Sequence, residues 1–389
     1  MKYWRGYLTA AIIALFSWAL IDFAAAHSNL IDMVYPYVTR MLQTSLADWT
    51  GGVDFTLWQV LLSVLVVGVL ASGLMMILLR WNAVQWFGWV LTAASVLFLL
   101  HTGIYGLNNY AGSIADDIRL EVTEYTLSEL ENATVYFRDK ANELADQIRR
   151  DSSGDPEYPS FRELAEQAGE GFNTLVYEES YSIFAGSTVP VKELGWENMY
   201  TSRGTSGVTV ALTGESAVNP KTPAVAIPFA MCHEMAHRMC IAVDSDANLS
   251  AFLACRANSS IEFQYSAYFM AYRYCQNALE LVNSNASLEA AGRVAGGVND
   301  NLYNDLAAYE KFFSSQKEEA PTKISGLVSE EKTPVNVCDL LVSWHIREFV
   351  LPLQTEDDTK FDPYDESQVD LSGIVNAPTK EDDNAQNAP

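Results

Sequence analysis

Two long stretches of the chain carry no charged residue, residues 55–79 and 84–106, and each is long enough to cross a lipid bilayer. A polypeptide inside hydrocarbon must satisfy its backbone hydrogen bonds internally, so stretches of this kind fold as helices. Residues 6–26 are apolar apart from Asp22 and can form a third spanning helix, or a signal peptide that ends in small residues. We favour the retained helix. The sequence therefore predicts a membrane region over residues 1–106, with three spans and the lipid bilayer as its partner.

The basic residues of this region indicate its orientation. Lys2, Arg5 and Arg80 all fall on the cytoplasmic side if the N-terminus is inside, which the positive-inside tendency favours. Three crossings, or two after cleavage of the first segment, then place everything after residue 106 outside the cytoplasmic membrane. Residues 28–54, between the first two spans, are expected to lie on the membrane surface. Their apolar positions are Met33, Tyr35, Val38, Met41 and Leu42.

The remainder of the chain is predicted to be a mainly α-helical domain with a small β element, over residues 107–354. Capping boxes at Thr126 and Ser160 begin two helices. Gly, Ser and Thr punctuate residues 181–213 and predict short strands, the last over 207–213. Further helices are predicted over residues 244–255, 260–283, 298–316 and 335–351, and the acidic residues 355–389 are predicted to be a disordered tail.

Composition narrows the classes of partner. With 49 Asp and Glu against 24 Lys and Arg, the formal charge is -25, which argues against nucleic-acid binding because that function needs a basic footprint. The five cysteines are an odd number outside the membrane, so at least one is unpaired or bridges to another chain. We expect Cys232 and Cys240, which flank the motif described next, to serve packing.

The motif His-Glu-Met-Ala-His over residues 233–237 is the strongest indication of chemistry. His233 and His237 are four residues apart and therefore share one helical face, so both imidazoles can reach one zinc ion. Glu234 lies where it can take a proton from the water that the zinc activates. The alternative is an ordinary core helix with two hydrogen-bonded histidines and a buried Glu, which leaves several buried polar groups to satisfy.

A catalytic zinc needs a third protein ligand and an open position. Asp244 and Asp246 are the candidates, and Asn248 follows one helical turn after Asp244, where it can orient a ligand. No third histidine follows His237 at the metzincin spacing, so the sequence favours a zincin with a carboxylate ligand. The predicted strand at 207–213 comes just before this helix, where a peptidase holds an extended substrate along a strand edge.

The run Cys-His-Glu-Met-Ala-His, followed by Asp-Ser-Asp-Ala-Asn-Leu-Ser-Ala-Phe-Leu-Ala-Cys, resembles the DUF3810 family of bacterial membrane proteins. Three shorter runs extend the resemblance over most of residues 30–285: Gly-Leu-Asn-Asn-Tyr at 106–110, Val-Lys-Glu-Leu-Gly at 191–195, and Thr-Gly-Glu-Ser-Ala-Val-Asn at 213–219. The resemblance implies a zincin-like α+β domain anchored in the membrane, with metallopeptidase activity on an undescribed substrate.

This chain departs from the family pattern at three positions. The family usually has Gly at Cys240 and Glu at both Asp244 and Asp246. Related zinc peptidases with a Glu-x-x-Ala-Asp/Asn motif use the first acid as the ligand, which makes Asp244 the first choice and Asp246 the second. Because Asp is one methylene shorter than Glu, the second helix must approach the first more closely.

The sequence thus predicts a membrane-anchored zinc peptidase that cleaves peptide or protein substrates, with Glu234 as the general base. Tyr265, Tyr268 and His345 are candidates for the group that stabilises the oxyanion. A catalytically degenerate zinc-binding sensor or assembly protein is the main rival hypothesis, and a purely structural zinc site is a weaker one. The oligomeric state does not follow from the sequence.

Overall fold

The structure is a computed structural model that describes residues 2–313 and 335–352. The chain divides into two compact units, Met1–Trp344 and His345–Pro389, and the first holds almost all of the described elements. The predicted tail, residues 355–389, lies outside the described residues, as do the last residues of the helix predicted over 298–316. The helices of the membrane region and its surroundings are α1 (Arg5–Ala26), α2 (Ser28–Thr50), α3 (Leu57–Leu78), α4 (Ala83–Ile104) and α5 (Ile114–Asp117).

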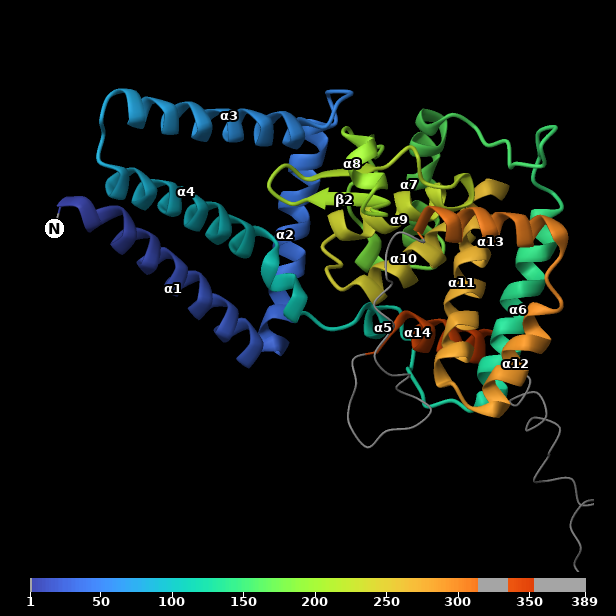
Figure 1. The fold of residues 1–389 in the computed structure, drawn as a ribbon. Helices are drawn as coiled ribbons and strands as arrows, with labels where there is room; N and C mark the ends of the chain where they lie inside the picture. Colours follow the sequence, from blue (N-terminus) through green and yellow to red (C-terminus); the bar gives the residue numbers. More distant parts are fainter. Residues whose placement is uncertain (1, 314–334, 353–389) are drawn as a thin grey trace, which may run out of the picture. The chain divides into compact units, whose positions relative to one another are not determined.

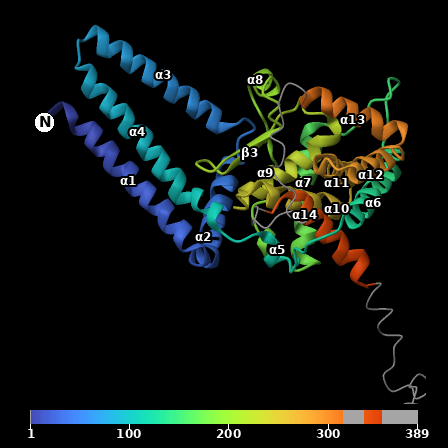
Figure 2. The ribbon, with the colours of Figure 1, turned by 60° about the horizontal axis from the view of Figure 1, so that its bottom comes forward.

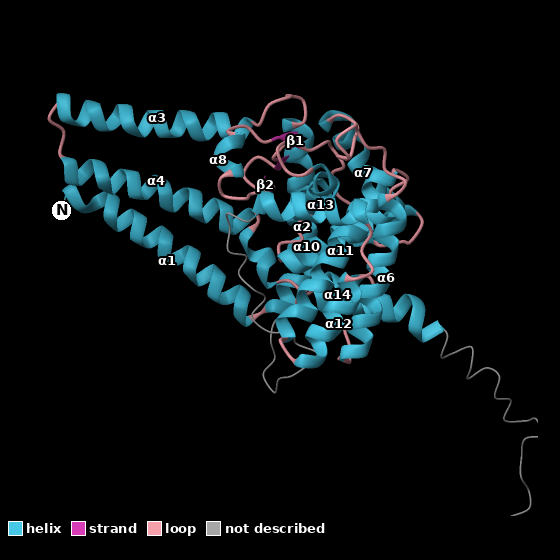
Figure 3. Cartoon of the chain, turned by 45° about the vertical axis from the view of Figure 1, so that its right-hand side comes forward, coloured by secondary structure: helices cyan, strands magenta, loops and turns pink. Residues whose placement is uncertain are grey.

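The remaining elements form the domain that follows (Figures 1 and 3). They are α6 (Leu127–Ala145), α7 (Phe161–Tyr177), β1 (Lys192–Glu193), α8 (Glu197–Thr201), β2 (Gly207–Val210), β3 (Glu215–Val218), α9 (Ile227–Arg238), α10 (Asp244–Ala257), α11 (Ile261–Val282), α12 (Asn285–Ala295), α13 (Asp300–Phe313) and α14 (Val337–His345). The chain is therefore mainly helical with a small sheet, as the sequence predicts.

Three helices, α1, α3 and α4, are long and apolar enough to cross a membrane, which confirms the three predicted apolar helices. The Thr92 hydroxyl of α4 donates to the carbonyl oxygen of Gly6 in α1 at 2.8 Å, so these two helices pack together near their N-terminal ends. Figure 1 shows the N-terminus beside the turn that joins α3 to α4. Arg5 and Arg80 therefore lie at the same end of the three helices, and the domain that follows them lies at the other end (Figure 2).

Helix α2 buries its polar side and exposes its apolar side. Arg40 and Gln43 are buried against the domain, where Arg40 donates to the carbonyl oxygen of Met239 at 3.1 Å and Gln43 to that of Ala211 at 3.0 Å. The opposite face carries exposed apolar side chains, namely Leu30, Met33, Val34, Tyr37, Val38, Met41 and Trp49. A helix of a soluble protein has the reverse arrangement. The residues expected to lie on the membrane surface thus form a helix whose apolar face has no protein against it in the described chain.

A buried ion pair joins the sheet to the start of α3. The Glu215 carboxylate accepts hydrogen bonds from the backbone N–H groups of Leu57 and Trp58, at 2.7 and 2.9 Å, and so caps the helix. Lys192 donates to the same carboxylate at 2.7 Å and to the carbonyl oxygens of Thr50 and Phe55. Both charged side chains are almost fully buried. Two of the family-like sequence runs therefore meet at the junction of the apolar helix α3 and the domain.

The sheet has the strand order β1-β3-β2, with β1 parallel and β2 antiparallel to β3, so β2 is an edge strand. The strand predicted over 207–213 is shorter than expected and ends at Val210. Thr213 then closes a turn by donating its backbone N–H to the Val210 carbonyl oxygen at 3.1 Å, and Gly214 adopts a positive φ of 67°. The chain returns as β3, which the sequence analysis did not identify.

An aromatic core holds the domain together. Phe137 of α6, Phe252 of α10 and Trp344 of α14 are each almost fully buried, and the ring centroids of Phe252 and Trp344 lie 4.8 Å apart. Tyr268 packs edge-on against Phe252 in this core, at 5.9 Å. The tyrosine stripe of α11 therefore serves packing here.

Candidate metal centre

Helix α9 carries the two predicted zinc histidines on one face. Pro228 is within its first turn, where a missing N–H costs nothing. The helix is buried nearly all round. The helix ends at Arg238 and is capped by Met239, and Cys240 follows in the left-handed region at φ 69°, a conformation that favours Gly. The turn that follows brings the Ile241 carbonyl oxygen to 2.8 Å from Nδ1 of His237, so Nε2 of that ring is left to face the site.

Three side chains meet at this face. The Nε2 atoms of His233 and His237 are 3.0 Å apart, and Asp244 Oδ1 lies 3.2 Å from His237 Nε2 and 4.0 Å from His233 Nε2. Ligand atoms at about 2.0–2.1 Å from a tetrahedral zinc are about 3.3 Å from one another. The spacing of the three atoms therefore fits the donor set of a zinc ion, with two nitrogens and one carboxylate oxygen. The carboxylate of Asp244 remains mostly exposed, which leaves an open side.

The two candidate aspartates lie on different sides of α10. Asp244 is the first residue of α10 and joins the histidines. Asp246 is buried on another side of the helix, where the Ser113 hydroxyl donates to it at 2.7 Å. Burial raises the pKa of Asp246, against the lowering effect of this hydrogen bond and of the Ile114 backbone N–H. The structure thus places the first-choice ligand at the cluster and holds the second choice away from it.

Glu234 is buried beside the cluster, under the edge strand. The Thr209 hydroxyl donates to its carboxylate at 2.6 Å, and a Cβ added to Gly207 would lie 2.6 Å from its Cγ. Strand β2 can therefore pass over the carboxyl only because Gly207 has no side chain. Burial raises the pKa of Glu234 to about 7, although His237 and the Thr209 hydroxyl lower it. A carboxyl group with a pKa near 7 is suited to accept and return a proton.

The protonation states of the histidines suit metal binding in part. Burial and the neighbouring His237 lower the pKa of His233, so this ring is neutral, as a metal ligand must be. Burial opposes protonation of His237, but its hydrogen bond to Asp244 and the charge of Glu234 raise its pKa. The hydrogen bond with His237 in turn lowers the pKa of Asp244. The negative charges of Asp244 and Glu234 that favour a proton on His237 would equally favour a zinc ion bound between the two rings and the Asp244 carboxylate.

Asn248 lies where the sequence analysis expects it, one turn after Asp244. Asn248 and His233 line the same cavity, and the Asn248 side chain favours the protonated form of the His233 ring. Nδ1 of His233 is buried and has no hydrogen-bond partner in the part of the chain that the structure describes. Asn248 is therefore the side chain that can fix the orientation of this ring.

The candidates for the oxyanion group fare differently. Tyr265 is buried away from the cluster in a network in which its hydroxyl donates to Asp305, and Asp305 pairs with Arg150 at 2.7 Å. Tyr268 belongs to the aromatic core. Neither tyrosine contacts the cluster or Glu234 through these interactions, because both side chains extend from α11 into other parts of the core. His345 begins the second compact unit.

A tyrosine that the sequence analysis did not single out is closer to the site. Tyr105 follows α4 directly, and burial raises its pKa, with smaller contributions from the acidic side chains of Glu234 and Asp244. Tyr105 is at the end of the uncharged stretch 84–106, directly before the family-like run at 106–110, and an aromatic residue at the end of an apolar stretch gives no signal of chemistry by itself. The residue after the apolar helix α4 is thus influenced electrostatically by two acidic side chains of the candidate site.

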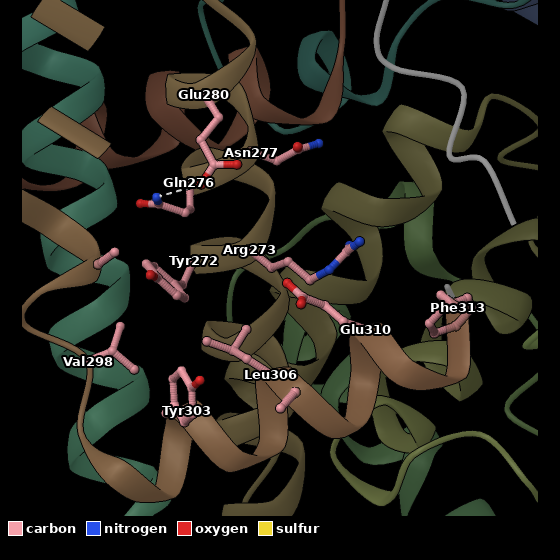
Figure 4. Close-up of a pocket in the computed structure, with 12 residues that line it drawn as sticks. Tyr272, Arg273, Gln276, Asn277, Glu280, Val298, Tyr303, Leu306, Glu310 and Phe313 are labelled. Carbon is pink, nitrogen blue, oxygen red and sulfur yellow. Dashed lines mark hydrogen bonds between the residues drawn. The ribbon is translucent and has the colours of Figure 1, made fainter. Parts of the chain in front are cut away.

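Two cavities adjoin α11 and α13. The first, of about 270 Å3, has His233, Asp244 and Asn248 in its wall. The second, of about 550 Å3, is lined by Arg273, Glu280 and Glu310 among others, as Figure 4 shows. The side chain of Phe313 belongs to the walls of both.

Comparisons with known proteins identify the chain by its family alone. No curated protein and no solved structure matches it. The family described as "Protein of unknown function (DUF3810)" matches residues 31–328, a range that runs from α2 through the candidate metal centre to beyond α13. The chain belongs to the DUF3810 family.

Proposed function

We propose that this protein is a membrane-anchored zinc peptidase that hydrolyses peptide bonds outside the cytoplasmic membrane. The observation that carries the proposal is the meeting of two imidazoles and one carboxylate at 3.0–4.0 Å, next to the buried carboxyl of Glu234. His233, His237 and Asp244 would hold the zinc, in a zincin-like arrangement. A bound zinc ion supplies Lewis acidity, which lowers the pKa of water and polarises a carbonyl group.

The residues of the chain then supply positioning and proton transfer. Glu234 takes a proton from the attacking water and passes it to the leaving amine. The hydroxyl of Thr209 orients the Glu234 carboxylate at 2.6 Å. Strand β2 is the sheet edge, so an extended peptide can pair with its backbone and run past Glu234. The same strand therefore fixes both the base and the substrate.

The membrane placement rests on the three apolar helices and on α2. Arg5 and Arg80 lie at the end of those helices remote from the domain, and basic residues favour the cytoplasmic side. Helix α2 lies between α1 and α3 in the sequence, and its exposed apolar face could insert into the surface of the bilayer. The domain and its metal centre would therefore sit on the outer surface, close to the membrane.

Labelling tests the orientation. All five native cysteines are buried, so a cysteine at the exposed position Tyr177 (Tyr177→Cys) is a single reactive site. A membrane-impermeant maleimide should label this variant on intact cells as fully as after lysis. Labelling that requires lysis would place the domain in the cytoplasm.

A single substitution tests the activity. Glu234→Gln should retain zinc and reduce peptide hydrolysis by about 10²–10⁴-fold, because the amide cannot take the proton. Glu170→Gln, an exposed substitution of the same kind on α7, is the control and should cleave like the wild type. Cleavage that survives Glu234→Gln would refute the mechanism. A wild-type protein that binds zinc and cleaves nothing would instead support the sensor hypothesis.

A further inference from the structure

The first cavity extends directly from the metal centre. His233 and Asp244 form one part of its wall. Away from them the wall is apolar and aromatic, with Phe229 of α9 and Met270 and Tyr274 of α11. The rings of Phe229 and Tyr274 have centroids 6.3 Å apart. A group bound at the metal centre thus has a hydrophobic recess beside it.

The size of this recess suits one large side chain. An apolar protein cavity of about 150 Å3 holds a benzene molecule. The recess is about 270 Å3, which leaves room for a phenyl ring or a branched aliphatic group together with the adjoining peptide backbone. Among the described residues that line it, Asp244 of the metal cluster is the only acid and there is no Lys or Arg.

The second cavity has a different character. Arg273 lies at its edge with its guanidinium 4.2 Å from the ring centroid of Tyr309, and Tyr309 lines the first cavity. Glu280 and Glu310 are further charged residues around it (Figure 4). An apolar side chain of a ligand at the metal centre would therefore contact apolar residues in the first cavity, whereas the second cavity would present charged residues to it.

The edge strand leads a peptide to the same place. Ser206 lines the first cavity, and β2 begins at the next residue, Gly207. A peptide paired with β2 projects alternate side chains to one side. A peptide that pairs with β2 near Gly207 would therefore have a side chain close to Ser206, which lines the recess.

We propose, on the basis of the proposed peptidase function, that the first cavity is a specificity pocket. It selects peptides with a bulky apolar residue (Phe, Tyr, Leu or Met) directly beside the scissile bond. The small residue Ala230 sets the depth of the pocket, because it lines the recess one helical turn before Glu234.

Cleavage-site profiling tests this inference. Zinc-loaded full-length protein in detergent is incubated with a complex peptide mixture, and the new termini are read by mass spectrometry. One position flanking the cut should be enriched in bulky apolar residues. Ala230→Leu, which fills the recess, should lower the ratio of bulky to small residues there by at least about tenfold, the usual effect of a methylene or more in a hydrophobic pocket.

A matched substitution serves as control. Ala307→Leu adds the same group at the wall of the second cavity, and the profile should stay that of the wild type. Cleavage with no preference beside the bond, or an Ala230→Leu profile equal to that of the wild type, would overturn the pocket assignment while the peptidase function stands.

A binding measurement separates the two proposals if no cleavage occurs. A peptide hydroxamate with a benzyl side chain should bind the zinc-loaded protein at least about tenfold more tightly than its methyl counterpart. This difference should disappear in Ala230→Leu and persist in Ala307→Leu. Selective binding without cleavage would keep the pocket and reject the peptidase function. Equal binding of both hydroxamates would reject the pocket.

Discussion

Removing the buried cation at the junction of α3 and the sheet should destabilise the protein strongly. Lys192 is replaced by Met, which has similar length and no charge. Lys192 forms three hydrogen bonds with 2.7–3.0 Å between donor and acceptor, to Glu215 and to the carbonyl oxygens of Thr50 and Phe55. The substitution leaves the Glu215 carboxylate, whose side chain is 0% exposed, without its counter-charge. Breaking a buried ion pair in this way costs about 3–5 kcal/mol.

An exposed ion pair of similar length gives the matched control. Lys221 lies 2.9 Å from Glu197, and both side chains are 42% exposed. Exposed pairs contribute about 0–1 kcal/mol, so Lys221→Met should leave the free energy of unfolding nearly unchanged. The contrast between the two lysines isolates the effect of burial.

Thermal unfolding of the full-length protein in detergent measures the difference. Tryptophan fluorescence can follow the unfolding of the chain, which has nine tryptophans, and one of them, Trp58, packs against Leu194 and Ala217 at the junction. At about 2–4 °C per kcal/mol, Lys192→Met should lower the Tm by about 6–20 °C, and Lys221→Met by less than about 4 °C. Equal shifts for the two variants would refute the view that the buried pair anchors the domain to α3.

Three further substitutions test the site and its surroundings. Gly207→Ala should reduce peptide hydrolysis with zinc retained, because its Cβ would lie 2.6 Å from Cγ of Glu234; unchanged hydrolysis would contradict the close approach. Asp244→Ala should weaken zinc binding at least about tenfold, and Asp246→Ala should not, as metal titration of each variant would show. Cys240→Gly should raise the free energy of unfolding by about 1 kcal/mol, measured by thermal melting, since Gly adopts the φ of 69° without strain; a destabilised variant would reject the strain.

The helices of the chain could be predicted because their signals are local. Apolar length identified the three apolar helices, and the capping boxes at Thr126 and Ser160 begin α6 and α7 as predicted. The third strand was missed because Glu215–Val218 is short and is held by pairing with two other strands. Such a strand has little signal of its own.

The contacts of α2 could not be predicted from its sequence. Its apolar positions suggested a surface helix, but nothing local shows that Arg40 and Gln43 would be buried, because their partners at Met239 and Ala211 are far along the chain. The role of the Lys192–Glu215 pair also could not be predicted from the sequence. Both residues stood in runs that carried the family resemblance, yet their common role as an anchor for α3 appears only in three dimensions.

The candidate metal centre shows most clearly how far the sequence can predict a site. The spacing of His233 and His237 was sufficient to place both on one face. Asp244 and Asp246 both stood in the first turn of the next helix, so the sequence left both open. Residues two apart on a helix point about 200° away from each other, which means that one acid at most can face the histidines. The hydrogen bond from Ser113 to Asp246 decides which one does.

Zinc analysis of the purified full-length protein tests the central claim most directly. The wild type is predicted to hold about one zinc per chain, bound by His233, His237 and Asp244, whose side-chain atoms converge. The double variant His233→Ala, His237→Ala should hold none, and should remain folded by circular dichroism. A full equivalent of zinc in that folded double variant would contradict the account.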